Sequence, residues 1–162
     1  HSILEAVANE LAEDGIELVS SIDYVKNLLA EKGCLTKRKP SENETADIEF
    51  GWKIAKKIAG MEIGQCIVVK DRIVLAVEAI EGTNETIKRG GELGRGKVVV
   101  IKLSKKGQDP RFDVPTIGTE TVDYLKEAGV STLAIEAKKT LILDKEDTVK
   151  LADKNKISII AL

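Results

Sequence analysis

The chain has 162 residues, of which 43% are hydrophobic and 32% are charged, and its formal net charge is −2. This length and composition predict one globular domain, and no apolar run reaches the roughly 18 residues that a membrane-spanning helix needs. The small negative charge excludes a general nucleic-acid binder, because such a protein must neutralise several phosphates with a basic excess.

The few cysteines and the single histidine limit the catalytic and metal-binding chemistry available to this chain. Cys34 and Cys66 are far apart without CxxC spacing, which favours two buried thiols in a reducing compartment and predicts a cytoplasmic location. His1 is the only histidine, so Ser-His-Asp triads and HExxH zinc sites are excluded. Any chemistry must therefore use carboxylates, Lys, Arg and backbone amides. The only methionine is Met61, so we expect a fragment or domain of a longer protein.

Hydrophobic periodicity predicts mainly helices in the first 60 residues. The expected elements are a helix over residues 3–11 followed by Gly15, a strand over 16–19, a helix capped by Ser21 and ending near Gly33, an exposed connector over 37–45, and a helix carrying Ile48, Trp52, Ala55 and Ile58. Because Trp52 shares the apolar spacing of this last helix, we interpret it as a core residue rather than a ligand contact.

The next segment predicts a tight hairpin followed by a βαβ unit. The apolar runs Cys66–Val69 and Ile73–Val77 flank a short turn, and a helix capped by Thr83 leads to a third strand at Val98–Leu103. The second and third of these strands should be parallel, joined by a right-handed crossover.

Parallel strands end at the same edge of a sheet, and ligands of open α/β sheets bind outside that edge. Glu78 and Glu81 follow the first strand of the unit, and Lys102 ends the second. These charged residues should therefore converge, although structural ion pairing is an equal alternative for each glutamate.

The glycine-rich stretch over residues 90–97 partly matches the sequence motif of a phosphate-binding loop. It matches GxxxxGK, but Val98 stands where Ser or Thr should hold magnesium, and the motif leads into a strand rather than a helix. We interpret the glycines as a helix stop and turn, with a loop lying over the site as the alternative. Arg89 and Lys88 stay candidate anion contacts.

Residues 105–118, KKGQDPRFDVPTIG, predict a stiff charged ridge. Each of its two prolines pushes the preceding residue into extended backbone, so no helix can run through. Because side chains alternate along such a segment, Asp109, Arg111 and Asp113 share one face, and Pro110, Phe112 and Val114 share the other. A solvated loop with an incidental ion pair is the alternative interpretation.

The remainder predicts a helix over 122–128, strands over 132–135 and 140–143, a short helix after Asp144 and a strand over 157–162. The predicted fold class is α/β, with a mixed, largely parallel sheet flanked by helices in a single domain.

Carboxylates beside Lys and Arg at a strand edge favour phosphoryl transfer. In that chemistry carboxylates hold magnesium, cations neutralise phosphate oxygens, and the protein does little covalent work. In an extended segment Asp109 and Asp113 would stand roughly 13 Å apart, so one magnesium ion cannot bind both. Which of the two holds the metal stays open.

Three segments together closely resemble the UDP-2,3-diacylglucosamine pyrophosphatases of the LpxI type. These segments are TADIEFGWKIAKKIAGMEIGQ (45–65), VEAIEGTNETIKRGG (77–91) and GQDPRFDVPTIGTET (107–121). The resemblance implies a two-domain, magnesium-dependent enzyme that hydrolyses UDP-2,3-diacylglucosamine to UMP and 2,3-diacylglucosamine 1-phosphate, a step towards lipid A. Residues 1–162 would be its carboxyl-terminal catalytic-type domain, expected to be inactive without the amino-terminal domain. Asn84 departs from the family, which more often has Asp there.

The residues and the resemblance select the same candidate site. The predicted catalytic residues are Asp109, Asp113 and Lys102, the substrate-binding residues are Arg111, Gln108, Arg89 and Thr83, and the Mg²⁺ ligands are Asp109, Glu78 and Glu81. The expected partners are a nucleotide-sugar lipid substrate and the amino-terminal domain. Peripheral contact with the inner membrane and a homo-oligomeric state are left open. The alternative function is a non-catalytic nucleotide-sugar or anion-binding module.

Overall fold

The computed structural model describes residues 2–105, 111 and 113–162. Within these residues the helices are α1 (Ser2–Glu13), α2 (Glu42–Gly60), α3 (Thr83–Gly94), α4 (Thr119–Glu127) and α5 (Lys145–Lys154), with 3-10 turns η1 (Ser21–Tyr24) and η2 (Lys26–Leu28). The strands are β1 (Gly33–Cys34), β2 (Cys66–Lys70), β3 (Ile73–Val77), β4 (Val98–Lys102), β5 (Thr116–Ile117), β6 (Val130–Ile135), β7 (Leu141–Ile142) and β8 (Ser158–Ala161). None of the described helices is long and apolar enough to span a membrane.

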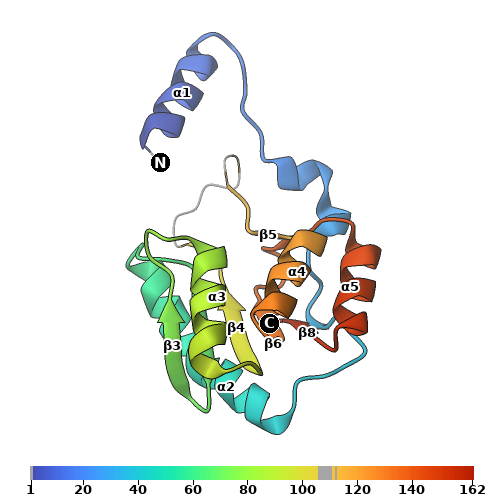
Figure 1. Ribbon diagram of the computed structural model, residues 1–162. Helices are drawn as coiled ribbons and strands as arrows, with labels where there is room; N and C mark the ends of the chain where they lie inside the picture. The colour runs from blue at the N-terminus through green and yellow to red at the C-terminus, as the bar shows by residue number, and fades with distance from the viewer. Residues whose placement is uncertain (1, 106–110, 112) are drawn as a thin grey trace.

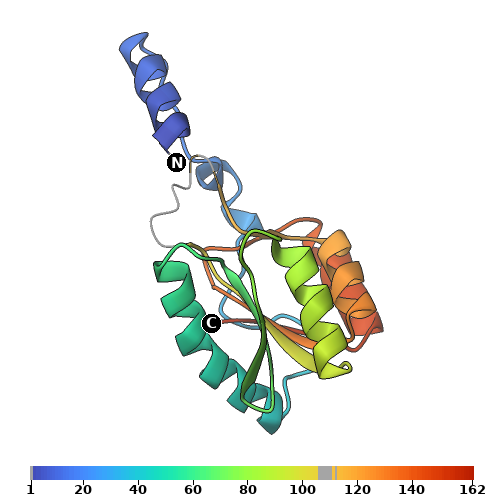
Figure 2. The same ribbon diagram turned by 60° about the vertical axis from the view of Figure 1, so that its left-hand side comes forward.

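The main sheet lies between two helical layers. Its strand order is β1-β8-β6-β4-β2-β3, and β5 pairs separately with β7. The central strands β4, β6 and β8 are parallel, while β1, β2 and β3 join antiparallel. Helix α2 covers one face of the sheet, and α3, α4 and α5 cover the other (Figures 1 and 2). The predicted single α/β domain with a mixed sheet flanked by helices is confirmed.

The predicted parallel relation of β3 and β4 is also confirmed, but the two strands are not neighbours. Both pair antiparallel with β2, which lies between them, so β3 and β4 run in the same direction. The hairpin turn between β2 and β3 has Asp71 at φ 52° and Arg72 at φ 58°, the left-handed pair typical of tight hairpins. Asp47 of α2 fixes this turn, because its carboxylate accepts the backbone N–H of Asp71 at 3.1 Å and of Arg72 at 2.6 Å.

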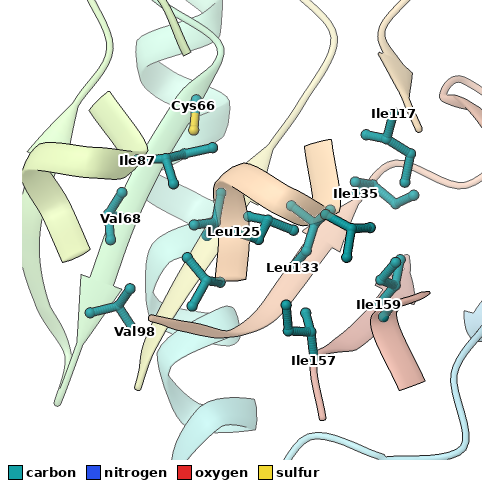
Figure 3. Close-up of a cluster of buried hydrophobic side chains, with 14 of the residues drawn as sticks. Cys66, Val68, Ile87, Val98, Ile117, Leu125, Leu133, Ile135, Ile157 and Ile159 are labelled. Atoms are coloured by element: carbon teal, nitrogen blue, oxygen red, sulfur yellow. The ribbon is translucent and has the colours of Figure 1, made fainter. Parts of the chain in front are cut away.

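The apolar side chains divide between the two faces of the sheet. On one face Ile67, Val69 and Ile101 pack with α2, and on the other Val68 and its neighbours pack with α3, α4 and α5 (Figure 3). This alternation follows the two-residue period of a strand, and it explains why β2 and β4 are apolar throughout.

The glycine-rich stretch contains the predicted helix stop and turn, but only at its end, because α3 continues to Gly94 and has Arg95 as its C-cap. Gly90, Gly91 and Gly94 lie within α3, and Gly96 alone takes a turn conformation, at φ 76°. A Cβ at Gly90 would overlap the side chain of Val68, so this glycine lets α3 approach β2 closely. Helix α3 also begins differently, because Gly82 rather than Thr83 is its N-cap.

The segment before α2 differs most from the predictions. Residues 16–19 form no strand, and the expected helix from Ser21 is the pair of 3-10 turns, with Ser20 as the N-cap of the first. Neither turn has a buried residue, so a longer helix would have no core against which to pack an apolar face. Helix α1 forms as predicted, but it projects away from the sheet, and Ile3 is 78% exposed (Figures 1 and 2).

Candidate functional site

Glu78 and Lys102, two of the predicted charged residues, lie at the carboxyl edge of β3 and β4. Glu78 directly follows β3 and donates its backbone N–H to the carbonyl of Cys66 at 2.9 Å, while Lys102, the last residue of β4, is the register partner of Cys66. The two residues therefore flank the same residue of β2, as the strand directions predict. Burial raises the pKa of the Cys66 thiol, and the Glu78 carboxylate raises it further, whereas Lys102 lowers it.

Glu78 is buried, and protein groups already bind both of its carboxylate oxygens. Oε2 accepts the backbone N–H of Gln65 at 3.1 Å, and Oε1 accepts the hydroxyl of Thr83 at 2.9 Å. Thr83, predicted to bind substrate, thus links the start of α3 to the end of β3. Oε1 of Gln65 is buried and has no hydrogen-bond partner among the residues that the structure describes.

Glu81 and Arg89 form an ion pair on the surface beside this edge. The guanidinium of Arg89 binds the Glu81 carboxylate and also donates to the carbonyl of Val77 at 3.0 Å, so α3 holds Arg89 over the end of β3. Hydrogen bonds from the backbone N–H groups of Glu81 and Ala79, together with Arg89, lower the pKa of Glu81.

Lys102 and the charged ridge are joined through the connection from β4 to β5. The Lys102 ammonium donates to the carbonyl of Thr116 at 3.3 Å, which places the end of that connection over the carboxyl edge. Arg111 and Asp113 are exposed, and Arg111 lies in a turn rather than in the extended backbone that was predicted for the ridge. Gln108, Asp109, Pro110 and Phe112 lie outside the described residues, so the alternation of side chains along the ridge stays a prediction.

Glu136 and Lys56 are two further charged residues at this edge, and neither was predicted as a site residue from the sequence. Glu136 directly follows β6, is 4% exposed, and binds the Lys56 ammonium and the backbone N–H of Ser104. Burial alone would raise the pKa of Glu136, but the hydrogen bond from Lys56 and that from the Ser104 backbone lower it to about 2. Its place after a buried strand is the signal that identified Glu78, and it could have identified Glu136 as well.

The described carboxylates do not form a ready magnesium site by themselves. Among residues 2–105, 111 and 113–162, no group of three or more His, Cys, Asp or Glu side chains could hold a metal ion. The oxygens of Glu78 and Glu81 are of the type that Mg²⁺ prefers, but each already accepts hydrogen bonds from the protein. Metal binding by Asp109, Glu78 and Glu81 stays a prediction.

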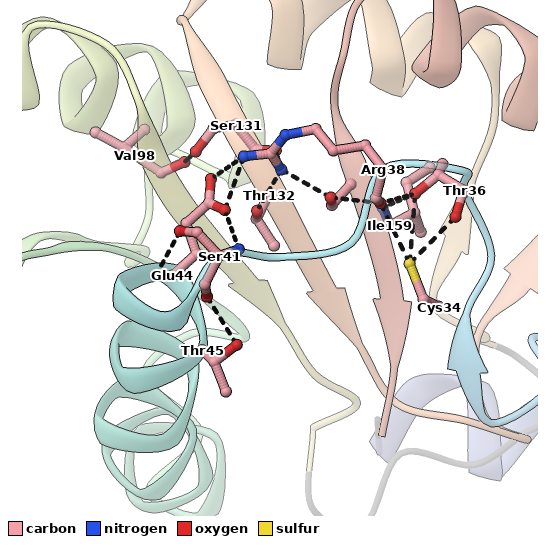
Figure 4. A network of polar contacts seen from close by, with 11 residues as sticks. Cys34, Thr36, Arg38, Ser41, Glu44, Thr45, Val98, Ser131, Thr132 and Ile159 are labelled. Atoms are coloured by element: carbon pink, nitrogen blue, oxygen red, sulfur yellow. Dashed lines mark hydrogen bonds and ion pairs between the residues drawn. The ribbon is translucent and has the colours of Figure 1, made fainter.

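The opposite edge of the sheet carries a separate polar network. Arg38 binds Glu44 at 2.7 Å and the Ser158 hydroxyl at 2.7 Å, so the segment predicted to be an exposed connector is instead anchored to β8 and α2 (Figure 4). Beside it lies a cavity of about 640 Å³, lined by Arg38, Glu44 and Lys126 among others. None of the predicted site residues that the structure describes lines this cavity.

Comparisons with known proteins match the chain to one family and to part of another protein. The family model described as the LpxI C-terminal domain matches residues 31–160. The UDP-2,3-diacylglucosamine pyrophosphatase LpxI of Caulobacter vibrioides (strain ATCC 19089 / CIP 103742 / CB 15) is 32% identical over 160 residues, covering 94% of this chain and 57% of the relative. The chain therefore spans little more than half the length of that relative.

Bifunctional purine biosynthesis proteins PurH are also similar to this chain. That of Bacillus subtilis (strain 168) is 29% identical over 136 residues, covering 81% of this chain and 23% of the relative. That of Bacillus thuringiensis (strain Al Hakam) is 28% identical over 131 residues, covering 77% and 22%. The family match covers most of the chain, including the carboxyl edge and both ends of the β4–β5 connection. The chain belongs to the family of LpxI C-terminal domains.

Proposed function

We propose that this domain is the carboxyl-terminal part of a magnesium-dependent hydrolase that cleaves the pyrophosphate bond of UDP-2,3-diacylglucosamine, giving UMP and 2,3-diacylglucosamine 1-phosphate in lipid A biosynthesis. The observation that carries the proposal is the convergence of Lys102, Glu78 and the Glu81–Arg89 pair at one strand edge in a chain of the LpxI family. The similar LpxI of Caulobacter vibrioides is named for this pyrophosphatase.

The residues at this edge suit a diphosphate. Phosphoryl transfer needs positioning and charge neutralisation more than covalent chemistry, so cations held in place by the fold are the main requirement. Lys102 is held at the end of β4 and Arg89 is held over the end of β3, which gives two fixed cations for phosphate oxygens. Arg111 is a third candidate on the ridge.

In this proposal some of the carboxylates bind the metal ion, and others hold neighbouring protein groups in place. Magnesium, when bound, supplies Lewis-acid stabilisation of the developing phosphate charge. Asp109 or Asp113 is the proposed metal ligand, with Glu78 or Glu81 assisting. Glu78 also keeps Thr83 and Gln65 in place. The Gln65 Oε1, which has no partner within the described part of the chain, can accept a hydrogen bond from substrate or from a metal-bound water.

The test uses the complete two-domain protein with UDP-2,3-diacylglucosamine and magnesium, and it measures UMP release by chromatography. We expect release that a chelator abolishes, and we expect Asp109→Ala and Asp113→Ala each to lower kcat by at least about 100-fold. Asp123→Ala, which removes an exposed carboxylate on α4, is the control and should retain turnover.

Two results would contradict the proposal. If both ridge variants hydrolyse the substrate at the normal rate, the ridge is an ordinary surface loop. If the complete protein binds the nucleotide sugar with magnesium but releases no UMP, the domain is a binding module and not part of a hydrolase.

A further inference from the structure

Glu136 connects three segments of the chain at the carboxyl edge. It directly follows β6, and its side chain is 6% exposed. Oε2 accepts the backbone N–H of Ser104 at 2.7 Å, and Oε1 accepts a hydrogen bond from the ammonium of Lys56. The carboxylate therefore ties the chain just after β4 to both α2 and β6.

Burying a carboxylate carries a desolvation penalty that apolar contacts between packed elements do not have. Well-packed apolar side chains of similar volume often stabilise a fold at least as well as a buried ion pair, so stability alone does not explain Glu136. The residue lies at the end of a parallel strand, which is where α/β folds place their ligands. Lys56 is 46% exposed, so the pair also reaches the surface at this edge.

The segment that Glu136 holds is the connection carrying the charged ridge. Ser104 is the second residue after β4, and the far end of the connection is fixed by the Lys102 hydrogen bond to Thr116 and by the pairing of β5 with β7. Both ends of the connection are thus tied by charged side chains of the carboxyl edge. The hydrogen bond from Ser104 to Glu136 fixes the first part of the connection.

We propose that Glu136 is a positioning residue for the hydrolysis proposed above. By accepting the Ser104 N–H, it fixes the direction in which the chain leaves β4, directly after Lys102 of the proposed site. Lys56 holds the carboxylate in its charged form and in the orientation that this bond requires. The inference rests on the proposed function, and Glu136 itself touches neither substrate nor metal.

The test compares four forms of the complete two-domain protein: wild type, Glu136→Ala, Glu136→Gln and Glu44→Ala. Misplacing a reacting group affects the transition state more than ground-state binding, so Glu136→Ala should lower kcat by at least about 10-fold while KM changes less than about 3-fold. Glu136→Gln keeps an oxygen that can accept the Ser104 N–H, and we expect it to recover most of the lost kcat.

Glu44 is the matched control because it resembles Glu136 in burial and bonding. It is buried, pairs with Arg38 at 2.7 Å and accepts the backbone N–H of Ser41 at 2.7 Å, but it lies at the opposite edge of the sheet. Glu44→Ala should lower stability and leave kcat within about 2-fold of wild type. An equal loss of kcat in Glu44→Ala and Glu136→Ala would overturn the inference, because it would show general loosening of the fold.

A second measurement keeps the inference independent of the proposed function. Amide hydrogen exchange at Ser104 should speed up by at least about 10-fold in Glu136→Ala and stay unchanged in Glu44→Ala, whether or not the protein hydrolyses this substrate. Unchanged exchange at Ser104 in Glu136→Ala would overturn the positioning role. If Glu136→Ala does not fold, Glu136→Asp replaces it, since the shorter side chain keeps the charge but withdraws the acceptor from Ser104.

Discussion

Two buried carboxylates, Glu44 and Glu136, show how single residues anchor the two edges of this sheet. Burial would raise the pKa of Glu44, but hydrogen bonds from Ser131, Ser41 and Arg38 lower it to about 2, and Glu136 behaves in the same way. A buried charge is tolerated when hydrogen bonds and an opposite charge replace its lost water. Each carboxylate therefore stabilises the fold only while it is ionised.

This dependence gives a prediction for acid stability. Because the folded pKa of Glu44 is about 2 and its ordinary value is 4.5, its contribution is complete above pH 4.5 and is lost as the pH falls towards 2. We expect the free energy of unfolding, measured with urea, to fall by roughly 2 kcal/mol per carboxylate across this window. Glu44→Gln should be less stable at pH 7 and lose less stability on acidification, whereas Glu120→Gln, at an exposed position, should follow wild type. Identical acid profiles for wild type and Glu44→Gln would contradict the assignment.

The candidate site was predictable wherever strand direction decides position. Glu78 and Lys102 could be placed together because parallel strands share a carboxyl edge, and both lie there. Lys56 could not be placed there, because the sequence does not show which end of α2 reaches β6. The contact between Thr83 and Glu78 was likewise hidden, since a threonine at a helix start is normally a cap.

At the scale of elements, local patterns predicted the parts that pack on the core. The hairpin of β2 and β3 and the helix α2 form as expected, because turn chemistry and helical spacing agree with burial. Strands β1 and β5 were not predicted, since two-residue strands are defined by their partners rather than by their own sequence. The position of β2 between β3 and β4 is set by tertiary packing, so it could not be predicted from local sequence patterns.

The close approach of α3 to β2 leads to a prediction about Gly90. A methyl group at this position would overlap Val68, so Gly90→Ala should lower the free energy of unfolding by about 1–3 kcal/mol, the usual range for an overpacked core. Gly60→Ala is the matched control, because it adds the same group at the end of α2 where nothing lies within 4 Å. The control should be neutral or slightly stabilising. Equal stability of Gly90→Ala and wild type in thermal unfolding would show that α3 shifts without penalty.

At the scale of the whole molecule, the chain carries its own core but only part of the length of its LpxI relative. The similarity to segments of PurH proteins shows that related domains occur in proteins with different names, so the fold alone does not fix the reaction. Under the proposed function, the reaction depends on the residues at the carboxyl edge and on the rest of the complete protein.

We therefore predict that residues 1–162 alone are folded but release little or no UMP from UDP-2,3-diacylglucosamine. If binding energy is shared between two domains, removing one leaves the reacting bond poorly positioned. Circular dichroism checks folding, and chromatography of the nucleotide products checks turnover. Restoring the amino-terminal segment should restore magnesium-dependent release, whereas full turnover by the isolated domain would contradict the shared-site hypothesis.

The burial of Cys66 allows openings of the sheet to be measured by thiol labelling. Its thiol is fully buried beneath the edge where Glu78 and Lys102 meet, and its raised pKa keeps it in the unreactive protonated form. A thiol reagent can therefore modify Cys66 only when β2 separates from its neighbours, so the labelling rate counts openings of the sheet. A ligand that bridges this edge should lower the labelling rate of Cys66. The size of this decrease measures how strongly the ligand stabilises the closed sheet, even when no product is formed.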